Sequence, residues 1–123
     1  MLEKGLKHNS VMRVEEGNTA EFIGSGDMAV LATPAMVALM ENAAMLAVAL
    51  HLGEGETTVG TMVSTSHLKA SKVGNYVEAR AELVNVDGRK LEFKIEAYDG
   101  ETLIGEGTHT RFIVNREKFL SKL

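Results

Sequence analysis

Glu41 is the residue whose surroundings in the sequence point most clearly to chemistry. The stretch from Ala35 to Leu50 consists of Ala, Met, Leu and Val apart from Glu41 and Asn42. A carboxylate enclosed by such residues is costly to desolvate unless it is paired or neutralised. Groups in that situation are suited to act as a general base or a nucleophile. The alternative is a structural Glu that bonds to neighbouring backbone or lies at a subunit contact.

Thr33 lies eight residues before Glu41, a little over two helical turns away. The two side chains can therefore share one helix face. On local grounds Thr33 is best interpreted as a helix cap, because it precedes Pro34 and its hydroxyl can accept a backbone N–H. The same position presents free N–H groups, which can hold a carbonyl oxygen or an oxyanion.

His67 lies in the strand-like segment from Thr58 to Ala70. Strict alternation puts it on one face of that strand with Val59, Thr61, Val63 and Thr65. A histidine there either takes part in proton transfer or has a structural role in the core. The remaining histidines are interpreted as structural or terminal, and they are His8, His51 and His109.

Composition narrows the classes of function. The chain has no cysteine, which excludes disulfides, thiolate metal sites and a Cys nucleophile. The histidines have no metal-binding spacing and there is no phosphate-binding glycine motif. The formal net charge of −4 contains no long run of either sign. We therefore predict no metal, no cofactor, and no nucleic-acid or membrane partner. Because no apolar signal segment begins the chain, we expect a cytoplasmic protein.

The first elements that must position these residues are a short strand and an irregular segment. Asn9 to Glu15 is predicted to be a short strand, and a turn follows it. The glycine-rich segment Glu21 to Leu31 is predicted to be a mobile loop or lid. A helix is then expected from Thr33–Pro34 to Leu50, with Gly53 as its stop. This helix is apolar all round, so we expect it to be surrounded.

The second half of the chain is predicted to be a meander of long antiparallel strands. After Thr58 to Ala70, the segments Tyr76 to Val86, Leu91 to Ala97 and Glu101 to Val114 alternate between apolar and polar residues. The Asp-Gly pairs at 87–88 and 99–100 are hairpin signals. Asn115 to Leu123 is predicted to be a terminal helix that docks through Phe119 and Leu120. Strands with one apolar face can wrap one side of a helix.

Three segments carry a family resemblance: ATPAMVALMENAA at 32–44, VGTMVSTSH at 59–67 and IGEGTHTR at 104–111. Together they resemble the fluoroacetyl-CoA thioesterase-like family of hot-dog-fold proteins. The resemblance implies an α+β hot-dog fold, with an antiparallel sheet wrapped around one long central helix, over a single domain of residues 1–123. It also implies a homodimer with its sites at the subunit interface, and a higher oligomer is the alternative assembly.

The resemblance further implies an acyl-CoA thioesterase, with CoA present only as part of the substrate. By position, the reactive residues of the family fall on Thr33, Glu41 and His67, and a glycine near the thioester carbonyl falls on Gly60. The fluoroacetyl enzyme has a lid of phenylalanines before its helix, whereas the corresponding segment here has Phe22 as its only aromatic residue. The resemblance therefore implies a thioesterase but not a particular acyl group.

Other residues are expected to contact the substrate. Phe22, Met36 and Met40 are expected to line the acyl site, although methionines at helical spacing are also typical core residues. By location, Lys69, Lys72 and Arg89 are candidates to hold the CoA phosphates.

We predict hydrolysis of a small acyl-CoA thioester to the free acid and CoA. Two other functions fit the same fold: a non-catalytic acyl-CoA or small-ligand binding module, and a dehydratase or hydratase. A pure binder has no need to bury Glu41, so that residue is what favours an enzyme.

Overall fold

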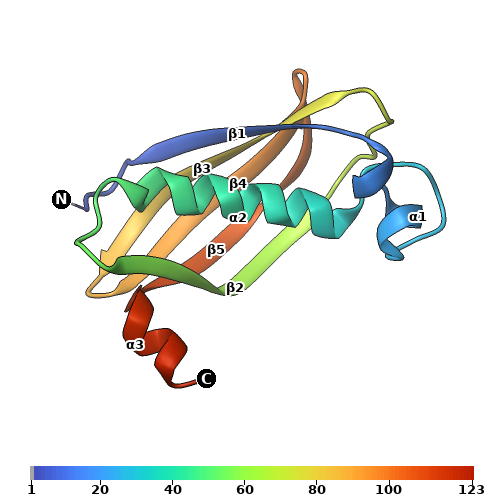
Figure 1. Cartoon of the computed structure of the whole chain (residues 1–123). Helices are drawn as coiled ribbons and strands as arrows, with labels where there is room; N and C mark the ends of the chain where they lie inside the picture. The colour runs from blue at the N-terminus through green and yellow to red at the C-terminus, as the bar shows by residue number, and fades with distance from the viewer. Residues whose placement is uncertain (1) are drawn as a thin grey trace.

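A five-stranded antiparallel sheet curls around one long helix in the computed structural model, which describes residues 2–123 (Figure 1). The strands lie side by side in the order β1-β3-β4-β5-β2. In chain order the elements are β1 (Lys7–Arg13), η1 (Glu16–Asn18), α1 (Ala20–Ile23), α2 (Thr33–Ala49), β2 (Glu56–His67), β3 (Tyr76–Asp87), β4 (Lys90–Asp99), β5 (Thr102–Asn115) and α3 (Arg116–Ser121). The predicted sheet around a central helix is confirmed. Met1, which the predicted domain includes, lies outside the described residues.

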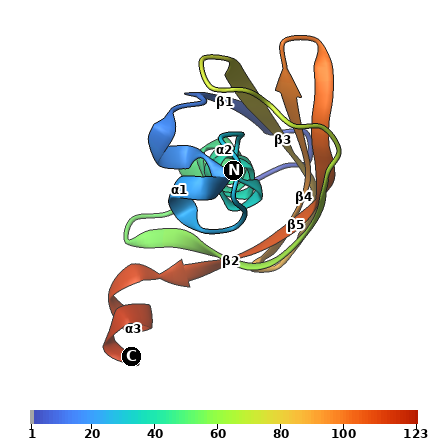
Figure 2. The same ribbon diagram turned by 90° about the vertical axis from the view of Figure 1, so that its right-hand side faces the viewer.

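The central helix α2 is buried on one side only. Figure 2 shows it end-on inside the curve of the sheet. The side chains that face the sheet are buried, and they are Met36, Leu39, Met40, Ala43, Ala44, Ala47 and Val48. On the opposite side Pro34, Ala38 and Asn42 are exposed. The prediction that this helix is surrounded is therefore wrong for the single chain, because one curled sheet covers only one flank of a helix.

The meander β3–β4–β5 forms as its alternation predicts. Buried residues on every second position of β3 and β4 face α2, and charged residues occupy the outer face. Gly88 and Gly100 sit in the two hairpin turns with φ of 61° and 63°, a region that glycine adopts without steric cost. These three strands are the rigid wall against which the helix packs.

Strand β2 departs from the predicted alternation. Its register against β5 shifts between Gly60 and Met62, so Thr61 is an extra residue in a β-bulge. The bulge reverses which residues face inward, because paired residues share a face of the sheet. Gly60 pairs with the buried Arg111, whereas Val59 lies on the outer face. The predicted common face of Val59 with His67 is therefore wrong.

The pairing with β5 identifies the residues on the inner face of β2. They are Thr58 and Gly60 before the bulge and Val63, Thr65 and His67 after it. As the last strand in the sheet order, β2 also leaves one edge without a neighbouring strand in the described chain.

Two segments differ from their predictions. The segment predicted as irregular contains one helical turn, α1, capped by the Thr19 side chain and ended by Gly24 in the left-handed region. Helix α3 forms as predicted, and the Asn115 side chain caps it. It projects away from the body of the molecule (Figure 1), and Phe119 and Leu120 remain exposed. Both side chains line a cleft with Thr57 and Val114, so the predicted docking of α3 is only partial in the single chain.

No helix within residues 2–123 is both long enough and apolar enough to cross a bilayer.

Candidate active site

Thr33 and His67 form a hydroxyl–imidazole pair at the start of α2. Thr33 Oγ1 lies 2.8 Å from His67 Nδ1, although the two residues are 34 positions apart in the chain. The residue at the cap position of α2 is Ala32, whose side chain makes no capping hydrogen bond. The interpretation of Thr33 as a cap is therefore wrong: its hydroxyl bonds to the ring at the end of β2 instead.

The environment of His67 favours its neutral form. Burial lowers the pKa of the ring, because removal from water penalises the charged imidazolium, and this effect outweighs the opposite influence of the nearby Lys69 backbone. The second ring nitrogen, Nε2, is buried and has no hydrogen-bond partner within residues 2–123. A buried polar atom without a partner is unusual and indicates a position where a ligand or a water completes the bonding.

A surface cleft of about 260 Å³ contains this pair. Its walls also include Leu31 before the helix and Lys69 after β2. The N–H groups at the start of a helix have no intrahelical acceptor and can bind an oxygen that carries negative charge. The cleft therefore combines a hydroxyl, an imidazole and a helix N-terminus.

Glu41 lies elsewhere on α2. Eight residues correspond to about 12 Å along the helix axis at a rise of about 1.5 Å per residue. The only ion pair of Glu41 in the described chain is with Arg111, at 3.8 Å, and its side chain is 40% exposed. The expected burial of Glu41 is therefore wrong for the single chain. The structure brings Thr33 and His67 together and leaves Glu41 apart from them.

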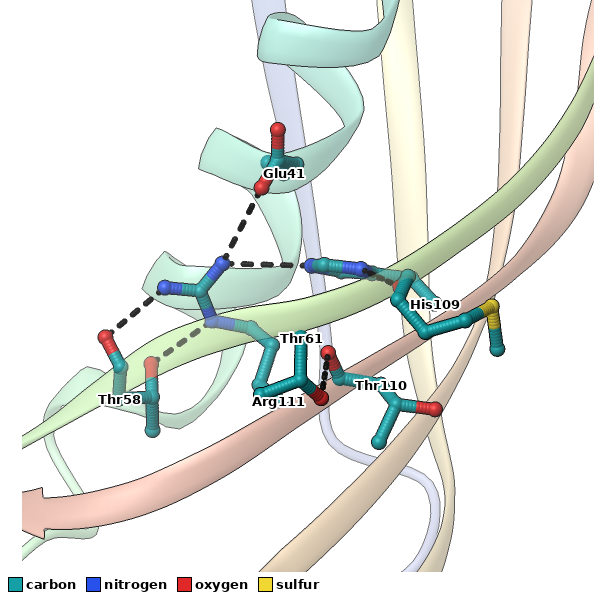
Figure 3. A network of polar contacts seen from close by, with 7 residues as sticks. Glu41, Thr58, Thr61, His109, Thr110 and Arg111 are labelled. Carbon is teal, nitrogen blue, oxygen red and sulfur yellow. Dashed lines mark hydrogen bonds and ion pairs between the residues drawn. The ribbon is translucent and has the colours of Figure 1, made fainter.

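A cluster of polar residues on β5 and β2 lies beside Glu41 (Figure 3). The Arg111 guanidinium donates to Thr58 Oγ1 and to the Thr58 carbonyl oxygen, at 2.8 and 2.9 Å. Arg111 Nη1 also lies 3.2 Å from His109 Nε2, and His109 Nδ1 lies 2.7 Å from the Met62 carbonyl oxygen. Sequence reasoning missed Arg111 and Thr58, and it treated His109 as structural.

Gly60 fits against this cluster because it has no side chain. A Cβ atom at position 60 would lie 2.8 Å from Glu41 Oε2 and 3.2 Å from Arg111 Nη1. The absence of that atom lets the edge strand approach the carboxylate closely. Gly60 is therefore placed beside Glu41, on the inner face of β2.

The expected acyl-site residues take three different positions. Met36 and Met40 are fully buried in the core between α2 and the sheet, so neither reaches the cleft surface. Phe22 lies on α1 and is 65% exposed. These positions account for the methionines as core packing and leave the Phe22 ring facing solvent in the single chain.

The three candidate phosphate ligands do not lie together. Lys69 lines the cleft with Thr33 and His67, and Lys72 pairs its backbone with Val30 nearby. Arg89 forms an ion pair with Glu56 at 3.4 Å. Because Glu56 begins β2 and His67 ends it, Arg89 lies at the far end of the strand from the cleft.

An antiparallel sheet curled around one helix, with a polar cleft where that helix begins, is the architecture of the hot-dog class of thioesterases. Comparisons with known proteins agree. The chain is 43% identical over 94 residues to the fluoroacetyl-CoA thioesterase of Streptantibioticus cattleyicolor. This alignment covers 76% of this chain and 68% of that protein. A solved structure of the fluoroacetyl-CoA enzyme FlK, as a variant in complex with acetyl-CoA, matches with a TM-score of 0.93 at 33% identity and covers 98% of this chain and 96% of that one.

A thioesterase-superfamily protein of Thermus thermophilus matches with a TM-score of 0.91 at 27% identity, covering 99% of this chain and 90% of that one. The family model described as fluoroacetyl-CoA-specific thioesterase, FlK, matches residues 14–117. The chain therefore belongs to the fluoroacetyl-CoA-specific thioesterase family, and it is a thioester hydrolase.

Proposed function

We propose that this protein hydrolyses a small acyl-CoA thioester to the free acid and CoA, with Thr33, His67 and Glu41 as its reactive residues. The observation that carries the proposal is the Thr33–His67 pair, 2.8 Å apart at the mouth of a cleft beside a helix N-terminus. A core histidine with a purely structural role would have both ring nitrogens bonded, whereas His67 Nε2 is buried without a partner among the described residues.

The start of α2 supplies the polarising groups. Met36 donates to the Ala32 carbonyl, and Pro34 has no N–H, so the N–H groups of Thr33 and Ala35 are the ones without an intrahelical acceptor. Together with the Thr33 hydroxyl they would hold the thioester oxygen as negative charge develops on it. Lys69 at the same cleft would contact the CoA portion.

Glu41 supplies the base or the nucleophile. In the base route, a water oxygen forms the new C–O bond, the water proton passes to Glu41, the C–S bond breaks and the proton passes on to the departing thiolate. In the nucleophile route, Glu41 attacks the carbonyl carbon and forms an anhydride as the C–S bond breaks and the CoA thiolate leaves. Water then hydrolyses the anhydride, which releases the acid, restores the Glu41 carboxylate and supplies the proton taken up by the thiolate. In both routes His67 Nε2 holds the reacting group in place, and Thr33 fixes the orientation of the ring.

A second copy of the chain would complete the site. In one chain Glu41 does not reach the Thr33–His67 pair, but β2, the strand beside Glu41, has one edge with no neighbouring strand among the described residues. We propose that two β2 strands pair antiparallel across a two-fold axis. The His67 end of the partner strand would then pair with the half of β2 that contains Gly60. Because Gly60 lies beside Glu41, the partner's His67 would also lie close to Glu41.

The test of this function is release of free thiol from a panel of short acyl-CoA thioesters, comparing the native chain with Glu41→Gln. The amide keeps the shape of the side chain but cannot act as a base or nucleophile, so we expect a loss of roughly 10²-fold or more in rate. The variant should remain folded, because position 41 is half-exposed and tolerates an uncharged amide.

Two results would contradict the proposal. A Glu41→Gln variant that hydrolyses its best thioester at the native rate would remove Glu41 from the mechanism. A native chain that binds acyl-CoA with no turnover of any thioester in the panel would indicate the binding module instead.

A further inference from the structure

The anchoring of Arg111 is a feature that the proposed roles leave unexplained. Its side chain is only 8% exposed, and Nε and Nη2 both donate to Thr58. Two bonds to one residue fix the plane of the guanidinium. Nη1 is the nitrogen that remains, and it faces both His109 Nε2 at 3.2 Å and Glu41 Oε2 at 3.8 Å (Figure 3).

The hydrogen bonds of His109 define its tautomer. Its Nδ1 lies 2.7 Å from the Met62 carbonyl oxygen, which can only accept, so Nδ1 carries the ring proton. Its Nε2 faces Arg111, which can only donate, so Nε2 is the unprotonated acceptor. Burial lowers the pKa of His109, and together with the charge of Arg111 it outweighs the hydrogen bond to Met62 and the charge of Glu41, which favours the neutral ring.

The β2 bulge is part of this arrangement. Met62 directly follows the extra residue Thr61, where the regular pairing of the strand is interrupted. His109 is fully buried and packs its ring against Phe93, with the ring centres 6.0 Å apart. The imidazole is therefore held by one hydrogen bond at the bulge and by packing against β4, which leaves Nε2 in a constant position.

We propose that His109 is a positioning residue for the reaction. Held by the Met62 carbonyl, it accepts one Nη1 hydrogen of Arg111 and thereby directs the other toward the Glu41 carboxylate. This inference rests on the proposed function, in which Glu41 reacts, and it adds the residues that aim that carboxylate. A half-exposed Glu would otherwise sample several rotamers, and small misplacements of a reacting group are costly in rate.

Two substitutions separate the two bonds of the imidazole. His109→Gln places an amide oxygen near the Nε2 position and keeps an acceptor for Arg111. His109→Asn keeps a donor for the Met62 carbonyl and removes that acceptor. We expect the Asn variant to lose about 10-fold or more in kcat with little change in KM, and the Gln variant to stay within about threefold of the native rate.

Arg111→Lys keeps the charge and loses the two-point attachment to Thr58, so its rate should resemble that of His109→Asn. Because His109 and Arg111 act as one unit, the double variant His109→Asn with Arg111→Lys should lose no more in kcat than the worse of the two single variants. His51→Asn is the matched control, since it makes the same chemical change at an exposed residue. Thermal melting of each variant separates loss of rate from loss of fold.

Nuclear magnetic resonance of the ring nitrogens gives a readout independent of turnover. We expect the native protein to show His109 protonated at Nδ1. Protonation at Nε2 would overturn the inference, as would additive losses in the double variant or equal losses in His109→Gln and His109→Asn. If the native chain hydrolyses no thioester, the proposed function fails, and the tautomer alone decides whether His109 holds Arg111 as described.

Discussion

At the scale of single residues, His67 has a ring that its surroundings keep neutral. Burial lowers its pKa below the ordinary value of 6.5, and Nδ1 bonds to the Thr33 hydroxyl. Protonation would make both ring nitrogens donors and would remove any acceptor at Nε2. As pH falls, we expect kcat/KM to hold through 6.5 and to decline only at lower pH, where the buried ring finally takes up a proton.

The measurement is a pH–rate profile beside a direct titration of the His67 ring by nuclear magnetic resonance. His67→Asn provides the assignment and should remove this ring titration. A His67 midpoint at or above 6.5 would contradict the effect of burial.

Thr33 and Arg111 illustrate what the sequence left undetermined at this scale. The Thr-Pro pair correctly predicted where α2 begins, but the hydroxyl bonds to a ring 34 residues away, which no local pattern encodes. Arg111 did have a signal: it alternates in phase with Ile113, an apolar residue of the inner face. A charged residue in that phase predicts a buried cation that needs an anionic partner, and Glu41 is that partner.

At the scale of elements, two glycines on neighbouring strands should respond differently to the same change. A Cβ at Gly107 would collide with the Ser64 carbonyl oxygen and with Thr65 Cα, which are backbone atoms that cannot move away. We expect Gly107→Ala to destabilise the fold by about 1–3 kcal/mol. A Cβ at Gly60 would meet the Glu41 carboxylate first, and that side chain can rotate.

Gly60→Ala should therefore cost less stability than Gly107→Ala but lower the rate by about 10-fold or more, because it displaces Glu41, the proposed base or nucleophile. Chemical denaturation and thiol release measure the two effects on the same preparations. A Gly60→Ala variant with native kcat would show that the contact with Glu41 has no role in the reaction.

The elements themselves were predictable to different degrees. The β3–β4–β5 meander and α2 follow from alternation, Asp-Gly turns and a Pro near the helix start, which are all local signals. The bulge at Thr61 depends on pairing with β5, so it was missed, and with it the correct inner face of β2. The helical turn α1 is too short to produce a periodic pattern.

At the scale of the whole molecule, the separation of Glu41 from the Thr33–His67 pair predicts complementation between chains. If each proposed site combines Glu41 of one chain with the pair of the other, a homodimer of either Glu41→Gln or His67→Ala has no intact site. A mixed dimer of the two variants then retains one intact site. Refolding the two variants together in equal amounts should restore roughly a quarter of the native activity.

Sedimentation at micromolar concentration checks the dimer itself, and a Lys in place of Ser64 on the exposed edge of β2 should weaken it. Complementation that stays at the background of the separate variants would place all three residues of a site in one chain. A monomer that retains full turnover would remove the partner from the site altogether.

The strand order also bears on how the protein folds. Strands β3, β4 and β5 are neighbours both along the chain and in the sheet, so each pairing closes only a short loop. Strand β2 joins β5 across a much longer loop, as in the Thr61–Thr110 contact of residues 49 positions apart, and the cost of closing a loop grows with its length. Because Gly60 and His67 belong to β2, we expect both to reach their positions late in folding, after the β3–β4–β5 meander has formed. We also expect β2 to open before the meander does in local fluctuations of the native state.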